Sequence, residues 1–206
     1  MGIELDIADV LEEVGVSFTI ERLGVAVDDV IEYLTYTPNS QVTKPFVREH
    51  FLECVFVAET QVLNGDVITF VESGDSYLVM NNSPDFFEDG VIRYLAVLYK
   101  TNVLIDIYHP QNTTVGYDTS FDFQLMYSAQ KALVSEPLFG NIEAFDENIG
   151  TYNLEKNQLY LPSGYGLEEQ DRIVINGTTE QYRVQTVIQR RYPNVIVADL
   201  GEDTRA

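Results

Sequence analysis

Three side chains of this 206-residue chain could carry out nucleophilic or acid–base chemistry: Cys54 and the two histidines, His50 and His109. A thiol becomes a catalytic nucleophile when a histidine within hydrogen-bond reach takes its proton. His50 and Cys54 lie four residues apart in REHFLECVF, a segment that alternates like a β-strand. At that spacing two residues share one face of a strand but lie about 13 Å apart. We therefore expect no Cys–His pair, with Cys54 as a small buried hydrophobe and His109 solvated at a strand end.

Acidic residues gather in two places where they could bind a calcium ion, which takes about six to eight oxygen ligands. These residues are Asp146, Glu147 and Asn148, followed by Gly150, and near the C-terminus Asp199, Glu202 and Asp203. Neither group has the ligand spacing of an EF-hand loop, so we expect solvated acidic loops and no metal. Paired carboxylates can also hydrolyse glycosides, but no pair stands out among the 33 acidic residues. A Gly-rich phosphate loop is missing as well. The sequence therefore predicts no catalytic, metal-binding or cofactor-binding residues, and hence a protein that is not an enzyme.

The charge of the chain is strongly unbalanced, with 33 Asp and Glu against 12 Lys and Arg and a net charge of −21. Such a surface repels phosphate, so we expect it to bind neither nucleic acid backbones nor anionic membranes. No apolar run approaches the ~18 residues that a membrane-spanning helix needs. The single cysteine excludes an intrachain disulfide, and the first residues carry acids where a secretion signal carries bases. We therefore expect synthesis in the reducing cytosol.

The densest basic spot is Arg190-Arg191, followed by Tyr192. In so acidic a chain, two adjacent arginines are better suited to an acidic patch on a neighbouring subunit than to nucleic acid. We therefore predict that Arg190 and Arg191 are interface residues. The alternative is that they lie at an exposed hairpin turn.

The elements that would position these residues are mainly β-strands. A helix is expected first, because apolar residues alternate with acids up to Val14 and Gly15 follows as a stop. After Gly15 the chain turns to segments rich in Val, Ile, Tyr, Phe and Thr at period two, which is typical of strands. Hairpin turns are expected at residues 64–66, 73–75 and 89–90, and a second short helix at residues 128–140.

A polar, turn-rich stretch at residues 109–120 predicts a boundary between two modules. We expect residues 1–110 to form an N-terminal β module with the leading helix. Residues 118–206 are expected to form a C-terminal β module.

The two modules share one layout. In each, an aspartate (Asp66 or Asp171) caps a turn at the head of a strand, and a tyrosine (Tyr77 or Tyr182) lies in the strand that follows. Small all-β modules are commonly closed into barrels, because closure removes the sheet edges. The predicted fold class is therefore mainly β, with two small β-barrel-like modules and a short N-terminal helix.

The C-terminal segment LYLPSGYGLEEQDRIVINGTTEQYRVQTVIQRRYPNVIVADL, residues 159–200, resembles the module of tailed-phage neck proteins, the head–tail connector or head-closure (stopper) group. An Asp-Arg-Ile strand, a short turn and a Tyr-Arg-Val strand carry the resemblance. The segment LDIADVLEEVGVSFTI, residues 5–20, resembles the start of such proteins. The segment TQVLNGDVITFVESGDSYLVMNN, residues 60–82, is similar to a further copy of the same strand pattern.

This resemblance implies a virion structural protein, assembled in the host cytoplasm, that forms a homo-oligomeric ring between the capsid portal and the tail. Its partners would be portal or adaptor proteins and tail proteins, with genomic DNA passing through without specific binding and with no membrane contact. An acidic lumen would repel the passing DNA. The alternative is an acidic twin-β-module protein that presents Tyr-rich loops to a protein or a carbohydrate.

Overall fold

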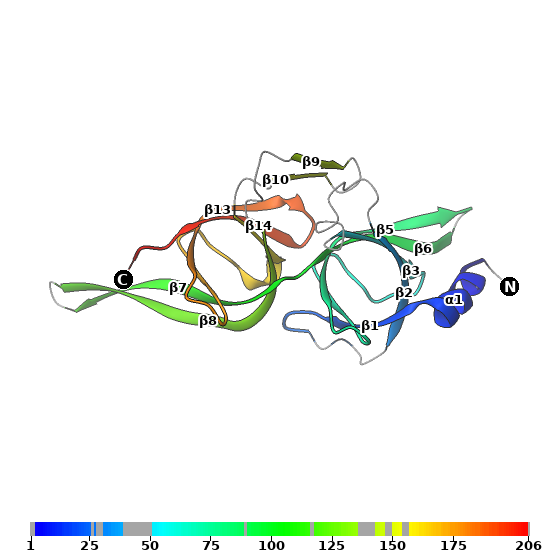
Figure 1. The fold of residues 1–206 in the computed structure, drawn as a ribbon, viewed down its shortest axis with the longest axis horizontal. Coiled ribbons are helices and arrows are strands. Elements are labelled where there is room, and N and C mark those ends of the chain that lie inside the picture. Colours follow the sequence, from blue (N-terminus) through cyan, green and yellow to red (C-terminus); the bar gives the residue numbers. More distant parts are fainter. Residues whose placement is uncertain are drawn as a thin grey trace.

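The computed structural model describes residues 3–25, 27, 31–38, 51–88, 90–115, 118–135, 143–146, 150–153 and 157–205. Over these residues the predicted fold class is confirmed, because the chain is mainly β and forms two closed six-stranded barrels behind a short N-terminal helix. Figure 1 shows the two barrels next to each other along the long axis of the molecule. None of the described helices has the length and the apolar run that crossing a bilayer requires.

The two barrels follow the same order of strand pairing. Around the first barrel the strands are β1 (Val16–Glu21), β2 (Glu32–Pro38), β3 (Phe51–Val57), β6 (Gly90–Lys100), β5 (Ser76–Phe87) and β4 (Val67–Phe70), which closes on β1. Around the second barrel they are β7 (Val103–Val115), β8 (Asp118–Ser135), β11 (Gln158–Pro162), β14 (Val195–Glu202), β13 (Gln181–Tyr192) and β12 (Arg172–Ile175), which closes on β7. A 3-10 turn, η1 (Ser163–Tyr165), and a separate hairpin of β9 (Glu143–Asp146) and β10 (Gly150–Asn153) complete the described elements. The predicted shared layout is therefore confirmed.

The register of the strand pairs shows which residues of the two barrels are equivalent. Ile20 on β1 pairs with Ile68 on β4, and Ile107 on β7 pairs with Ile173 on β12. Strands β5 and β13 also carry a β-bulge at matching positions. A bulge bends its strand and increases the local twist, so the matching bulges curve the two barrels in the same way.

Helix α1 spans Ile3–Val14 and ends at Gly15, as the sequence predicted. The N–H group of Gly15 donates to the carbonyl oxygen of Leu11 at 2.8 Å, and a Cβ atom at Gly15 would approach that oxygen to 2.3 Å. A larger residue would therefore displace the helix end. Leu11 is buried, and α1 packs against β2, β3 and β6, where it covers one end of the first barrel.

The predicted boundary at residues 109–120 is wrong. The chain leaves the first barrel at Lys100 and enters the second at Val103, and Asn102 exchanges side-chain hydrogen bonds of 2.7 and 2.9 Å with the backbone of Val134. The described part of 109–120 belongs to the β7–β8 hairpin. Pro110 was a misleading signal, because no described strand pairs with the other edge of β7 beyond Tyr108, and such an edge tolerates proline.

The predicted helix at residues 128–140 is also wrong where the structure describes it, since residues 128–135 are the end of β8. Ala132, Leu133 and Val134 are all buried, and β8 pairs there with both β7 and β11. Local helix propensity is worth only a few tenths of a kcal/mol per residue. Strand pairing on both sides and burial of three consecutive side chains therefore decide the conformation.

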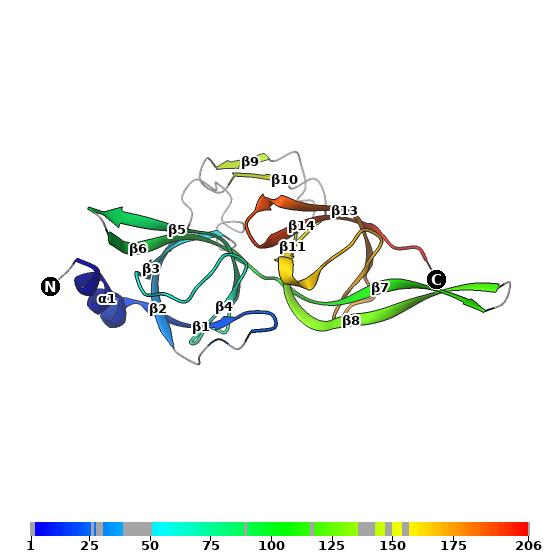
Figure 2. The ribbon, with the colours of Figure 1, turned by 180° about the vertical axis from the view of Figure 1, so that it is seen from behind.

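Three hydrophobic clusters hold the fold together. One fills each barrel, and the third lies between the barrels. In this third cluster, Phe51 and Tyr99 from the first barrel meet Tyr160 and Val197 from the second. The barrels are thus joined by a common core. The view from behind in Figure 2 shows the β13–β14 hairpin reaching from the second barrel toward the first.

Candidate functional site

Each barrel contains a buried aspartate that holds a turn in place. In the first barrel, Asp66 accepts a hydrogen bond from the N–H of Leu63 at 2.8 Å through its side chain, and its backbone carbonyl accepts from the N–H of Val79 at 2.9 Å. Gly65, just before it, has a φ of 87°, which favours glycine. The predicted capping role of Asp66 is confirmed by these contacts.

The second barrel repeats this turn. Asp171 accepts from the N–H of Glu168 at 2.8 Å through its side chain, and its backbone carbonyl accepts from the N–H of Val184 at 2.9 Å. Gln170 holds the position that Gly65 has in the first barrel and keeps the left-handed conformation, with a φ of 78°. Such a backbone is strained for a residue with a side chain, so the hydrogen bonds of Asp171 and its neighbours must hold this turn in place.

The two aspartates have different basic partners. Arg22 donates to both carboxylate oxygens of Asp66, from Nε and Nη2, each at 2.7 Å. His109 contacts Asp171 through Nδ1 at 2.7 Å, and its Nε2 lies 3.9 Å from a carboxylate oxygen of Glu168. Burial raises the pKa of Asp171, while hydrogen bonds from the N–H of Glu168 and from His109 act in the opposite direction. The prediction that His109 is simply solvated at a strand end is therefore wrong, because it lies within β7 and is bound to a buried carboxylate.

The structure describes one member, Cys54, of the catalytic pair that the sequence argued against. Cys54 is buried in the core of the first barrel, as expected, and this burial raises the pKa of its thiol. A thiol in that state is a poor nucleophile. His109 belongs to the other barrel, and His50 lies outside the described residues. A histidine oriented by an aspartate supplies two of the three members of a catalytic triad. The described contacts of His109 do not supply the third, a nucleophile.

Of the acidic residues near the C-terminus, Asp203 forms ion pairs and does not lie in a solvated loop. The side chain of Asp203 has no exposed surface and accepts hydrogen bonds from Nε of Arg172 and Nε of Arg205, both at 2.8 Å. The arginines hold the pKa of Asp203 well below its usual range. Asp199 accepts a hydrogen bond from Nε2 of Gln158 at 2.9 Å. Glu202, the third residue of this group, lies at the end of β14.

No cluster of potential metal ligands occurs in the part of the chain that the structure describes. In the first acidic group, Asp146 ends β9 and Gly150 begins β10. Glu147 and Asn148 lie outside the described residues.

Two arginine side chains make cation–π contacts with one aromatic ring and so attach the C-terminal segment. The sequence did not indicate these contacts. The guanidinium carbon of Arg172 lies 3.6 Å from the ring centroid of Phe123 on β8, and that of Arg205 lies 5.0 Å from it. Such contacts add to the attraction of the ion pairs. The chain end is thereby attached to the root of the β7–β8 hairpin.

Arg190 and Arg191 lie near the end of β13, at the hairpin with β14. Arg190 is exposed, while the guanidinium carbon of Arg191 lies 5.7 Å from the ring centroid of Tyr192. Tyr192 in turn packs against Tyr99 of the first barrel. Both arginines thus occupy an outer hairpin close to the junction of the barrels. A contact between them and a neighbouring subunit stays a prediction.

A cavity also lies at the junction of the barrels, lined in part by Glu21, Lys131, Gln130 and Tyr165. Polar side chains that line this cavity already form an ion pair and a hydrogen bond with one another. Lys131 forms an ion pair with Glu21, and the hydroxyl of Tyr165 donates to Gln130. Tyr165 is half-buried, so its ring packs into the protein. The cavity therefore lies at the contact between the two barrels, and the charged side chains that line it already have partners within the protein.

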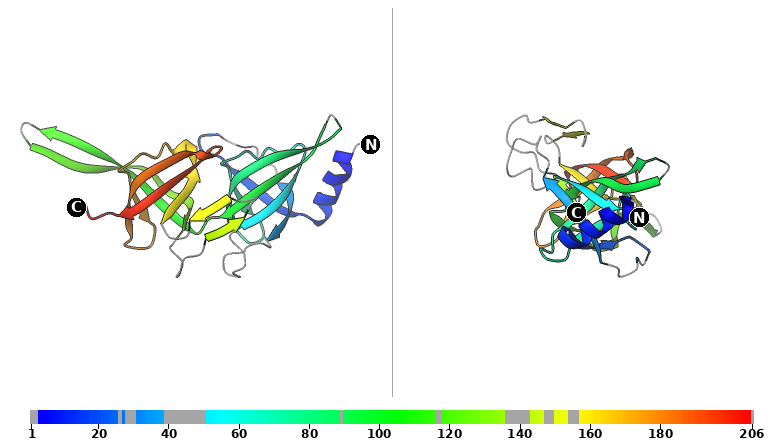
Figure 3. Two further views of the ribbon diagram at one scale, coloured as in Figure 1. Left: turned by 90° about the horizontal axis from the view of Figure 1, so that it is seen from above. Right: turned by 90° about the vertical axis from the view of Figure 1, so that its right-hand side faces the viewer.

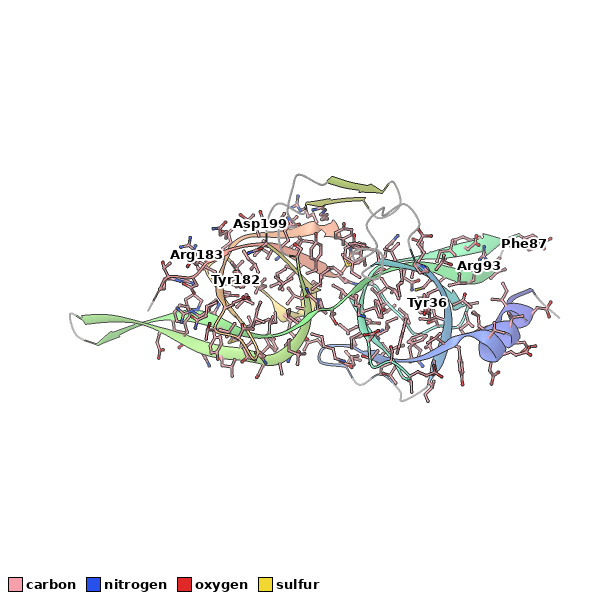
Figure 4. The ribbon with its side chains drawn as sticks, viewed as in Figure 1. Tyr36, Phe87, Arg93, Tyr182, Arg183 and Asp199 are labelled. Carbon is pink, nitrogen blue, oxygen red and sulfur yellow. The ribbon has the colours of Figure 1, made fainter. Side chains whose placement is uncertain are left out.

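Two hairpins extend beyond the barrels and carry exposed apolar side chains. Phe86 and Phe87, at the end of the β5–β6 hairpin, are 63% and 50% exposed, and Leu125 and Met126 are exposed on β8. The left view of Figure 3 shows the β7–β8 hairpin reaching out at one end of the molecule, opposite α1 and the β5–β6 hairpin. Figure 4 labels Phe87 at the outer end of its hairpin. Adjacent exposed apolar side chains on a projecting element are typical of interaction surfaces. Neither family models, nor curated proteins, nor solved structures match this chain.

Proposed function

We propose that this chain is a structural subunit of an oligomeric assembly, and that the assembly is the ring in the neck of a tailed phage, between the capsid portal and the tail. The observation that carries the proposal is the pair of projecting hairpins. A barrel with a complete core gains nothing for its own stability from Phe86 and Phe87 at a solvent-exposed tip. Such residues contribute free energy only when a partner covers them.

The β7–β8 hairpin supports the same proposal through its backbone. Beyond Tyr108, the described partner of β7 is β8, so residues 109–115 and 118–127 form a two-stranded arm. A two-stranded hairpin is marginally stable on its own in water. Its outer edges pair with no further strand in the described part of the chain, which makes them suited to a further protein element. We define these residues as the arm.

The charge supports the location in the neck. A net charge of −21 per chain gives a ring of many copies a surface that repels DNA, which suits a channel through which a genome passes without binding. The same charge opposes self-association, but charges are largely screened beyond about 8 Å at physiological salt. We therefore expect the ring to form at moderate salt and on its portal partner, which supplies a template for closure.

The proposal predicts the effect of making the β5–β6 tip polar. We expect the double variant Phe86→Ser, Phe87→Ser to lose most of its incorporation into rings in the presence of portal protein. Its thermal unfolding should stay close to that of the wild type, because substitutions of exposed residues usually change stability by about 0.5 kcal/mol or less. Native mass spectrometry and a melting curve measure the two quantities.

The matched control for this variant is Val71→Ser, which replaces a side chain that is also 50% exposed but lies on the β4–β5 turn. It should assemble like the wild type. Equal incorporation of the double variant would show that the tip is not an interface. A wild-type chain that stays monomeric with portal present would contradict the ring itself.

The predicted interface role of Arg190 and Arg191 has its own test. Reversing both charges, with Arg190→Glu and Arg191→Glu, should weaken ring formation without unfolding the chain, because the attraction to an acidic neighbour becomes a repulsion. Lys100→Glu is a suitable control, since Lys100 lies at the end of β6 away from the projecting tip and pairs with Asp75 at 2.9 Å. Native mass spectrometry with portal present compares the variants. Unchanged incorporation of the double variant would remove these arginines from the interface.

A further inference from the structure

The aspartate-held turn of each barrel is supported by a residue at the same position in the barrel. Arg22 follows Ile20 by two residues, and His109 follows Ile107 by two residues. Ile20 and Ile107 pair with equivalent isoleucines on β4 and β12, which precede the same pattern of strands. Arg22 and His109 are therefore equivalent, and the two barrels differ in the chemistry of one supporting side chain.

The two supporting side chains respond differently to pH. Arg22 makes two parallel hydrogen bonds to Asp66, and a guanidinium stays charged at every pH at which proteins are folded. His109 makes a single contact with Asp171, at 2.7 Å. Histidine side chains change charge in the range of about pH 5 to 8. A charged imidazole adds the attraction between opposite charges to its hydrogen bond with a carboxylate, an attraction that a neutral imidazole lacks.

We propose that His109 and Asp171 form a pH-sensitive brace at the root of the arm, which tightens when the imidazole is protonated, whereas Arg22 and Asp66 make the equivalent brace of the first barrel insensitive to pH. The position of His109 in β7 determines which part of the protein the brace affects. Tyr108 is the last residue of β7 that pairs with β12, so His109 is the first residue of the arm. Its bond to Asp171 ties the arm to the turn that precedes β12.

The charged groups around His109 determine the direction of the effect. Asp171 and Glu168 face it from the turn before β12, and both are acids. On β8 its paired residue is Gln124, which is uncharged. The guanidinium of Arg172, on β12, is directed to Asp203 and Phe123. A positive imidazole is thus attracted by both facing acids.

The brace therefore stabilises the barrel on the acidic side of the histidine range and weakens as the pH rises toward 8. Its lower limit is set by the carboxylate. Burial raises the pKa of Asp171, so in acid this group loses its charge at a higher pH than an ordinary aspartate does, and the attraction then disappears.

Exchanging the two supports tests the proposal. In His109→Arg, the pH dependence of thermal stability between about pH 5.5 and 8 should largely disappear. In Arg22→His, a second pH-dependent brace should appear and increase that dependence. We expect each change to be a shift in melting temperature of about 2–4 °C across the range, relative to the wild type. Wild-type pH dependence in His109→Arg would overturn the proposal, and so would an Arg22→His variant that folds and shows no added dependence.

A direct measurement avoids any difficulty with the folding of these variants. The chain has only two histidines, so His50→Gln leaves His109 as the single imidazole in an NMR titration. Adding Asp171→Asn to this background should lower the pH at which the imidazole of His109 changes charge, because the facing carboxylate is removed. With Asp171 present, amide hydrogen exchange in the arm, corrected for its intrinsic pH dependence, should be slower at pH 5.5 than at pH 8. With Asp171→Asn, this difference should be absent. An unchanged titration or equal protection of the arm would contradict the brace.

Discussion

Replacing Tyr99 with alanine should lower the free energy of unfolding by about 3–5 kcal/mol, the usual cost of truncating a large buried aromatic residue. The ring of Tyr99 is 1% exposed and lies in the cluster between the barrels. Its centroid is 4.7 Å from that of Phe51, 5.7 Å from that of Tyr160 and 6.4 Å from that of Tyr192. The cavity left by the substitution would therefore face both barrels, and urea denaturation followed by circular dichroism measures its cost.

Tyr36→Ala is the control for this prediction, because Tyr36 is in the same barrel but is 44% exposed. We expect its effect to be about 1 kcal/mol or less. The truncation of Tyr99 should also reduce the coupling between the barrels, so that unfolding, expected as one transition in the wild type, broadens or separates into two. A loss below about 1 kcal/mol for Tyr99→Ala would mean that the barrels do not share a core in solution.

The features that could be predicted from the sequence are those that depend on neighbouring residues. Period-two alternation indicated the strands, and Gly15 indicated the end of α1 because a glycine stop acts within a single turn. Asp66 and Asp171 could be matched because each acts on a backbone group three residues before it. A closed barrel then follows from the need to remove sheet edges.

The features that could not be predicted depend on pairing across long distances in the sequence. Residues 109–120 read as a linker because Pro110 and polar residues usually end a strand. The described part of this stretch continues a strand in the structure, because β7 and β8 pair with each other there. Likewise, nothing local identifies Arg22 as the partner of Asp66 or His109 as the partner of Asp171, which are 44 and 62 residues apart. Only the register of β1 with β4 and of β7 with β12 brings them together.

Replacing Asp203 with asparagine should cost about 3 kcal/mol at pH 7, because it leaves two partly buried arginines without their shared counterion. The carboxylate of Asp203 has no exposed surface, and the side chains of Arg172 and Arg205 are 13% and 20% exposed. The C-terminal segment should detach from β12 and from the ring of Phe123. Urea denaturation of wild type and variant gives the difference, and hydrogen exchange near Arg172 shows whether the attachment is lost.

The pH dependence of this difference follows from the low pKa of Asp203, which the hydrogen bonds from Arg205 and Arg172 hold below its usual range. A carboxyl group whose pKa is lower in the folded state stabilises the fold above its unfolded pKa of about 4 and loses this effect as the pH falls toward the folded pKa. The gap between wild type and Asp203→Asn should therefore be constant from pH 7 to about pH 5 and close below about pH 4. Asp75→Asn is the matched control, because the ion pair of Asp75 with Lys100 lies at the surface, where the contribution is about 1 kcal/mol or less. An Asp203 variant that behaves like the Asp75 variant would show that the C-terminal segment is not held by its ion pairs in solution.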